Sequence, residues 1–78
     1  MKDQIAWSYT VTLSGRTAVT SSPAGAVLVD TAGLLTIEYA NGKTDTVQLV
    51  AGVWHKIEFV ALHQSGTTAA GIHVGYLK

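Results

Sequence analysis

Residues 5–13 read IAWSYTVTL, and every second side chain along this stretch is large and apolar: Ile5, Trp7, Tyr9, Val11 and Leu13. The residues between them are small or carry hydroxyl groups. Alternation with a period of two is the pattern of a β-strand that buries one face. We therefore predict a strand from Ile5 to Leu13, with the aromatic residue Trp7 on its core-facing side.

The rest of the chain continues this β pattern. Thr, Val and Ile are spread evenly, glycine recurs between short apolar runs, and apolar residues do not follow helical spacing. We predict a single all-β domain over residues 1–78, a small antiparallel β-sandwich or open barrel of about six short strands. After the first strand, the expected strands are Ala26 to Val29, Leu34 to Ala40, Thr44 to Leu49, Trp54 to Leu62 and Gly71 to Leu77.

Turn-forming residues separate these strands. Ser14 to Arg16 reads as a turn, and Thr17 to Gly25 as an extended loop or edge segment. Asp30 to Gly33 is predicted to be a turn in which Gly33 takes a positive φ.

The pair Asn41-Gly42 is a strong hairpin signal. A two-residue loop would set Glu38 opposite Asp45, which brings like charges together. We therefore predict a register shifted by one residue, with a three-residue loop or a bulge near Lys43. The expected pairs are Leu35 with Leu49, Ile37 with Val47, and Tyr39 with Asp45.

Composition narrows the classes of function. Five Lys and Arg balance five Asp and Glu, and only 13% of residues are charged, so we expect no nucleic-acid partner. The chain has no cysteine, which removes disulfides, thiolate metal sites and a cysteine nucleophile. Neither a signal peptide nor a stretch of about 20 apolar residues is visible, so we expect no membrane association.

Small size predicts self-association. A chain of 78 residues buries only about 60–65% of the surface that its unfolded form exposes, so the monomer should be of marginal stability. The predicted strands Ile5 to Leu13 and Ala26 to Val29 contain no Lys or Glu to protect an open sheet edge. Both features favour a closed homo-oligomer.

Catalytic motifs are missing from the sequence. It has no phosphate-binding loop, nucleophile elbow or His-Glu-x-x-His motif, so we expect no enzyme and no cofactor. A zinc site would need His55, His63 and His73 to converge without short paired spacing, and ordinary hydrogen-bonded imidazoles are the simpler interpretation. The carboxylates, including Glu38 and Glu58, are scattered, and calcium-loop spacing is absent.

Aromatic residues are the remaining candidates for binding. Trp54, Tyr39 and Trp7 are the candidate interface or ligand contacts, with Trp54 the best member because it follows the connection Val50 to Val53. Trp7 and Tyr76 fall on alternating apolar faces, which favours a core position for both. The alternative is an aromatic platform for a sugar or peptide.

The order of elements from about Ala26 to Tyr76 is similar to a known family. The most specific piece is Ser65 to Ile72, read SGTTAAGI, followed by the aromatic residue Tyr76. The other matching pieces are AVLV at 26–29, TAGLLTI at 31–37, Asn41-Gly42, Thr46-Val47, Ala51-Gly52 and Ile57. Over these two-thirds of the chain the sequence resembles the small head spike base proteins of tailed phages and gene transfer agents.

The resemblance implies a virion structural protein on the capsid surface. Such a protein would bind copies of itself and the major capsid protein and would present a platform to a spike or fibre protein, without catalysis. Residues 1–13 lie outside the match, so the first strand is either an edge strand or an arm toward a neighbouring subunit. The alternative function is a carbohydrate- or peptide-binding β module of a phage tail or cell-surface assembly.

Overall fold

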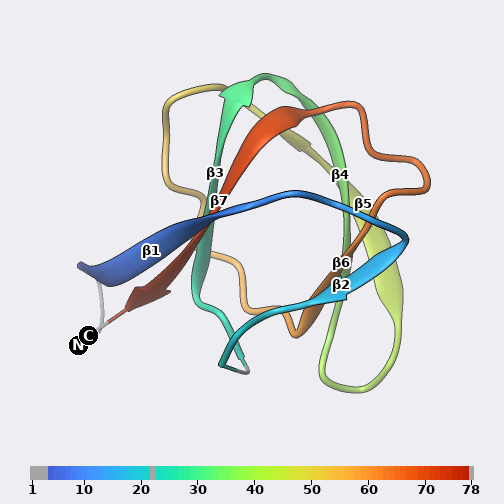
Figure 1. Ribbon diagram of the computed structural model, residues 1–78, viewed down its shortest axis with the longest axis horizontal. Coiled ribbons are helices and arrows are strands. Elements are labelled where there is room, and N and C mark those ends of the chain that lie inside the picture. Colours follow the sequence, from blue (N-terminus) through green and yellow to red (C-terminus); the bar gives the residue numbers. More distant parts are fainter. Residues whose placement is uncertain (1–3, 22, 78) are drawn as a thin grey trace.

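The computed structural model describes residues 4–21 and 23–77. These residues form seven strands and no helix, and hence no helix that could span a membrane. Sheet A has the order β1-β7-β3 and sheet B the order β2-β6-β4-β5 (Figure 1). The expected all-β class is confirmed, and the two antiparallel sheets do not close into a barrel. The strands are β1 Ile5–Val11, β2 Arg16–Ala18, β3 Ala26–Thr31, β4 Gly33–Glu38, β5 Thr44–Leu49, β6 Ala61–His63 and β7 Ala70–Leu77.

The hydrophobic core lies between the two sheets. Alternate residues of β3, β4 and β7 point inward, as the period-two pattern requires. Ile72, Val74 and Tyr76 of β7 are all buried, as predicted for the last strand. The largest fully buried side chains are Phe59, Leu35, Ile37, Leu49, Leu62, Val27, Val29 and Val74.

The first predicted strand ends two residues early, at Val11, although Leu13 still packs against the core. The chain then crosses to sheet B, where Arg16–Ala18 forms the short edge strand β2 beside β6. Arg16 was expected in a turn. Thr17 and Ala18 lie in the segment predicted to be an extended loop or an edge segment, and they form part of an edge strand. Three residues are too few for periodicity to set the bounds of such a strand.

The β4–β5 hairpin has the predicted three-residue loop, but the predicted pairs are wrong. Leu35 pairs with Val47 and Ile37 with Asp45. Tyr39 N–H donates to the Lys43 carbonyl at 2.8 Å, so residues 40–42 form the loop. Gly42 has a φ of 87°, and a three-residue hairpin needs such a residue at its last loop position. A loop over residues 41–43 would force Lys43 into this conformation, which is why the other register forms.

Gly33 begins strand β4 and does not adopt the predicted positive φ. Asp30 and Thr31 likewise belong to β3 and not to a turn. A Cβ at Gly33 would lie 2.7 Å from Thr68 Oγ1 and 2.8 Å from the Ala69 nitrogen. Glycine is therefore needed here for close approach of the chain and not for its φ.

The predicted long strand from Trp54 to Leu62 does not form. Only Ala61–His63 is a strand, β6, and the preceding segment touches β3 and its flank through isolated bridges. Phe59 exchanges backbone hydrogen bonds with Ala24 at 2.9 and 3.2 Å, and His55 does so with Val27 at 3.0 and 2.8 Å. The apolar alternation of this segment correctly indicates that Phe59 is buried. It is not accompanied by a continuous ladder of backbone hydrogen bonds to a neighbouring strand.

Candidate functional site

The edges of the two sheets differ in how they are covered. In sheet A, the outer side of β3 is bridged by Ala51 and His55. In sheet B, β2 is only three residues long, and β5 carries Asp45 with Lys43 just before it. Strand β1 is seven residues long, has no charged residue and pairs, within the described chain, with β7 alone. Charges and short length normally protect sheet edges, so β1 is the most open edge.

An aromatic stack lies on the inner side of β1. The Trp7 ring stacks on Tyr76 with centroids 4.1 Å apart and planes 10° apart, and its centroid lies 6.0 Å from that of Tyr9. The two tyrosines also hold the segment that follows β2, since Tyr9 Oη accepts from the Thr20 N–H and Tyr76 Oη from the Ser21 N–H, each at 2.9 Å. Burial raises the pKa of Tyr76. The stack is therefore fixed before any partner binds.

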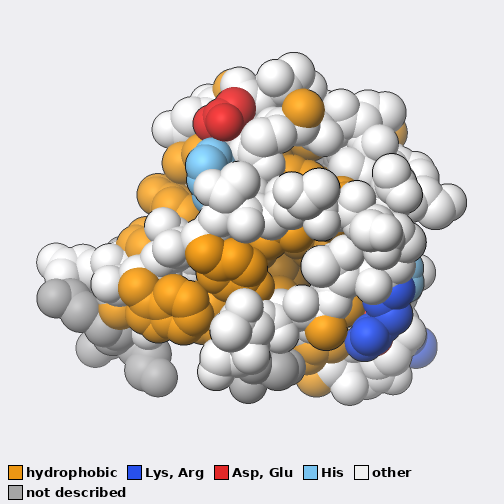
Figure 2. Space-filling model, in the orientation of Figure 1, with side chains coloured by type: hydrophobic (Ala, Val, Ile, Leu, Met, Phe, Trp, Pro, Cys, Tyr) orange, Lys and Arg blue, Asp and Glu red, His pale blue; other side chains and the backbone are white. Residues whose placement is uncertain are grey.

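The outer member of this stack reaches the surface. Tyr76 is buried as predicted, but Trp7 is 46% exposed, so its predicted core position is wrong. The register of β1 shifts between Ile5 and Trp7, and β1 is an edge strand with no neighbour on its other side in the described residues. Figure 2 shows hydrophobic side chains gathered over β1. This exposed, rigid apolar surface is the best candidate for an interaction site.

The candidate aromatics Trp54 and Tyr39 do not join this surface. Trp54 lies over Gly75, where an added Cβ would come within 2.7 Å of its ring. Gly75 and Tyr76 are neighbours in β7 and face opposite sides of sheet A, so Trp54 and Trp7 are on opposite faces. Tyr39 lies at the start of the β4–β5 loop, where its hydroxyl donates to Asp45 Oδ2 at 3.2 Å. Burial and this carboxylate raise the pKa of Tyr39.

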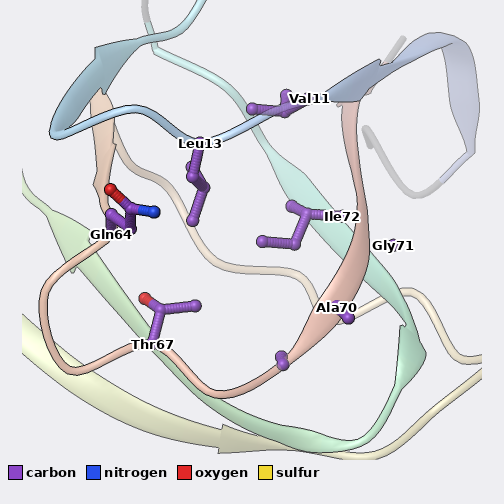
Figure 3. Close-up of a pocket in the computed structure, with 8 residues that line it drawn as sticks. Val11, Leu13, Gln64, Thr67, Ala70, Gly71 and Ile72 are labelled. Carbon is purple, nitrogen blue, oxygen red and sulfur yellow. The ribbon is translucent and has the colours of Figure 1, made fainter.

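Two hollows in the described structure adjoin the core. One, of about 230 Å³, opens between the end of β1 and the start of β7, where Leu13, Ile72 and Thr67 point toward its centre (Figure 3). This volume is below the usual range of about 300–1,000 Å³ for small-molecule pockets. The other, of about 350 Å³, lies at the lower end of this range and is bordered by Pro23, Gly25, Glu58, Tyr76 and Leu77, with a single charged group.

A charged cluster joins three strands of sheet B. Arg16 Nε and Nη2 donate to the two carboxylate oxygens of Glu38 at 2.9 Å each, and His63 Nε2 lies 2.8 Å from Glu38 Oε1. The Arg16 and His63 hydrogen bonds lower the pKa of Glu38 to about 2. Both oxygens are engaged, so the cluster fastens β2 and β6 to β4 and leaves no oxygen free for acid–base chemistry. No local sequence pattern indicates this cluster, because its members lie 22 or more residues apart.

The three histidines each have a local hydrogen-bond partner, as the simpler interpretation predicted. His55 Nε2 lies 3.2 Å from the Val50 carbonyl, and His73 lies between Thr10 and Asp30 at 3.2 and 3.3 Å. The three histidines share none of these hydrogen-bond partners. Among residues 4–21 and 23–77, no group of three His, Cys, Asp or Glu side chains is placed to hold a metal ion.

The turn that carries the most specific part of the resemblance fastens one sheet to the other. Thr68 Oγ1 accepts from the Leu34 N–H, and the Thr68 N–H donates to the Leu34 carbonyl, both at 2.8 Å. Thr67 Oγ1 accepts from the Thr36 N–H at 3.1 Å. These threonines bind the entry of β7 to strand β4, which is a structural role.

Comparison with protein-family models, with curated proteins and with solved structures finds no match to the chain.

Proposed function

We propose that the chain is a structural protein of a phage-like virion, a head spike base or capsid decoration protein. It would associate with copies of itself, bind the major capsid protein and present a platform to a spike or fibre protein. The proposal includes no catalytic step.

The open β1 edge with its exposed Trp7 is the observation that carries this proposal. A repetitive assembly needs a surface that gains free energy by contact with another subunit, and an unprotected strand edge flanked by apolar side chains provides one. Val50 and Val53, at 54% and 51% exposure, and Leu34, at 37%, add apolar contact area elsewhere. The viral context of the proposal comes from the resemblance of Ala26 to Tyr76 to the head spike base proteins.

Particles from the strain that encodes the chain provide the test. An epitope-tagged chain should co-sediment with purified tailed-phage capsids and should be located on the capsid surface by immunogold labelling. The heat-unfolded chain is the control for nonspecific adsorption. A folded chain that is monomeric at all concentrations and absent from the particle fraction would refute the proposal.

Trp7 also supports the second candidate function, a carbohydrate- or peptide-binding module. An exposed indole stacked on a fixed tyrosine offers an apolar face to a sugar ring or an aromatic side chain. A panel of sugars and peptides titrated against the Trp54→Phe variant, which retains Trp7, should then change the tryptophan emission. Unchanged emission and no hits on a glycan array would exclude this function.

A further inference from the structure

We propose that two copies of the chain pair antiparallel through their β1 edges, so that the two three-stranded sheets become one continuous sheet across a twofold axis at Ser8. This inference rests on the self-association in the proposed function and names the partner and register for it.

The backbone hydrogen bonds of β3, on the side of sheet A away from β1, determine toward which neighbouring strand each residue of β7 directs its N–H and carbonyl groups. Val27 uses its N–H and carbonyl to exchange bonds with His55. Its partner across the ladder, Val74, therefore does not bond to Val27 and directs its own groups toward β1. The Gly75 carbonyl, one residue on, accepts from the Gly25 N–H on the β3 side, as alternation requires.

This alternation continues into β1. Val74 is opposite Tyr9, so Tyr9 directs its N–H and carbonyl to β7. Its neighbours Ser8 and Thr10 therefore direct theirs away from β7, to the open edge. These donors and acceptors have no strand beside them in residues 4–21 and 23–77, and a second β1 running antiparallel would satisfy them reciprocally.

The length of β1 selects one register. The strand runs from Ile5 to Val11, so its midpoint is Ser8. Pairing Ser8 with Ser8 of the second copy makes a hydrogen-bonded pair at the centre, with Trp7 and Tyr9 in the flanking pairs, and brings only the outer pairs to the bulge between Ile5 and Trp7. Shifting the pairing to Ser8 with Thr10 would preserve the hydrogen-bond pattern but would set Trp7 opposite Val11 and leave the Ile5 end of each strand unpaired.

In this register the aromatic stacks of the two copies meet. Trp7 faces Tyr9 of the second copy, and Tyr9 faces Trp7, on the same side of the sheet as each copy's own stack. Both are non-hydrogen-bonded pairs, whose side chains approach most closely, and aromatic pairs are favourable there. The exposed face of Trp7 would be covered without bringing any charge into the contact.

Cysteine cross-linking tests the register, because the chain has no native cysteine. A hydrogen-bonded antiparallel pair has Cα atoms about 5.5 Å apart, within reach of a short bifunctional thiol reagent. Ser8→Cys should therefore form a covalent dimer when treated with such a reagent. Gln48→Cys, on the exposed side of the other long edge strand β5, is the matched control and should remain mostly monomeric.

A charge exchange at the same position provides an independent readout. Ser8→Lys and Ser8→Glu each place like charges opposite one another, so each alone should dimerise about two- to fivefold more weakly in sedimentation velocity. Mixing the two variants should restore dimers. Circular dichroism and thermal melts verify that both variants fold.

The outcomes separate the inference from the proposed function. Equal cross-linking of Ser8→Cys and Gln48→Cys, or no rescue on mixing folded variants, would overturn the β1 pairing, even if the chain still binds capsids. Selective Ser8→Cys dimers and rescue on mixing would establish the pairing, even if the chain proves absent from particles.

Discussion

Phe59 should be the main anchor of the irregular segment that covers β3, and Phe59→Ala tests this. The ring is fully buried, while Ile57 in the same segment is only half-buried. Truncating a buried Phe to Ala costs about 3–5 kcal/mol. A domain of 78 residues has a total stability of about 4–12 kcal/mol, so this one change should remove a large part of it.

Urea unfolding followed by tryptophan fluorescence and circular dichroism measures this loss. Phe59→Leu, which retains most of the apolar volume, should cost about 1–1.5 kcal/mol. Ile57→Ala, the matched control in the same segment, should cost about 1–2 kcal/mol. If Phe59→Ala lowers the free energy of unfolding by less than Ile57→Ala, the segment is not held by its buried ring and the description of the core is wrong.

Three further predictions concern backbone conformation, pH and a hydroxyl group. Gly42→Ala should lower the free energy of unfolding by about 1 kcal/mol in thermal denaturation, because the residue has a φ of 87° but an added Cβ would meet no atom within 4 Å. Gly71→Ala should lower it more, because the added Cβ would also collide with Asp30. Glu38 titrates near 2 when folded and near 4.5 when unfolded, so it adds stability above pH 4.5 that disappears as the pH falls toward 2. Glu38→Gln should flatten this acid limb in a pH series of urea melts, and an unchanged limb would contradict the ion pair's role. Tyr76→Phe should cost about 1 kcal/mol in the same melts, because it leaves the Ser21 N–H without its partner; no loss would show that water replaces the bond.

Local patterns predicted those parts of the fold that depend on side-chain alternation. The closing strand was predicted to within one residue, and its buried residues Ile72, Val74 and Tyr76 were identified correctly. Each decision there depends on neighbouring residues alone. The hairpin at Asn41-Gly42 was likewise found, but its register depends on where the positive φ of Gly42 falls within the loop.

Long-range features could not be predicted in this way. Gly33 is constrained by Thr68, 35 residues later, and Glu38 is held by Arg16 and His63, which come from two other strands. The segment from Trp54 to Val60 has the alternation of a strand, yet among the described residues only His55 and Phe59 of this segment bridge to β3 and its flank. Periodicity in the sequence indicates which side chains are buried. It does not indicate whether the backbone forms a continuous series of hydrogen bonds with a neighbouring strand.

Which sheet edges are exposed also depends on long-range contacts, and these contacts distinguish β1 from β3. From the absence of Lys and Glu, β1 and β3 looked equally unprotected. The fold then lays residues 51–59 along β3, so that its outer hydrogen-bonding groups meet Ala51 and His55. No described segment does this for β1, because the chain leaves β1 to cross directly into sheet B. Because the chain covers the β3 edge with its own backbone and leaves the uncharged β1 edge open beside a half-exposed tryptophan, we expect association to take place through β1.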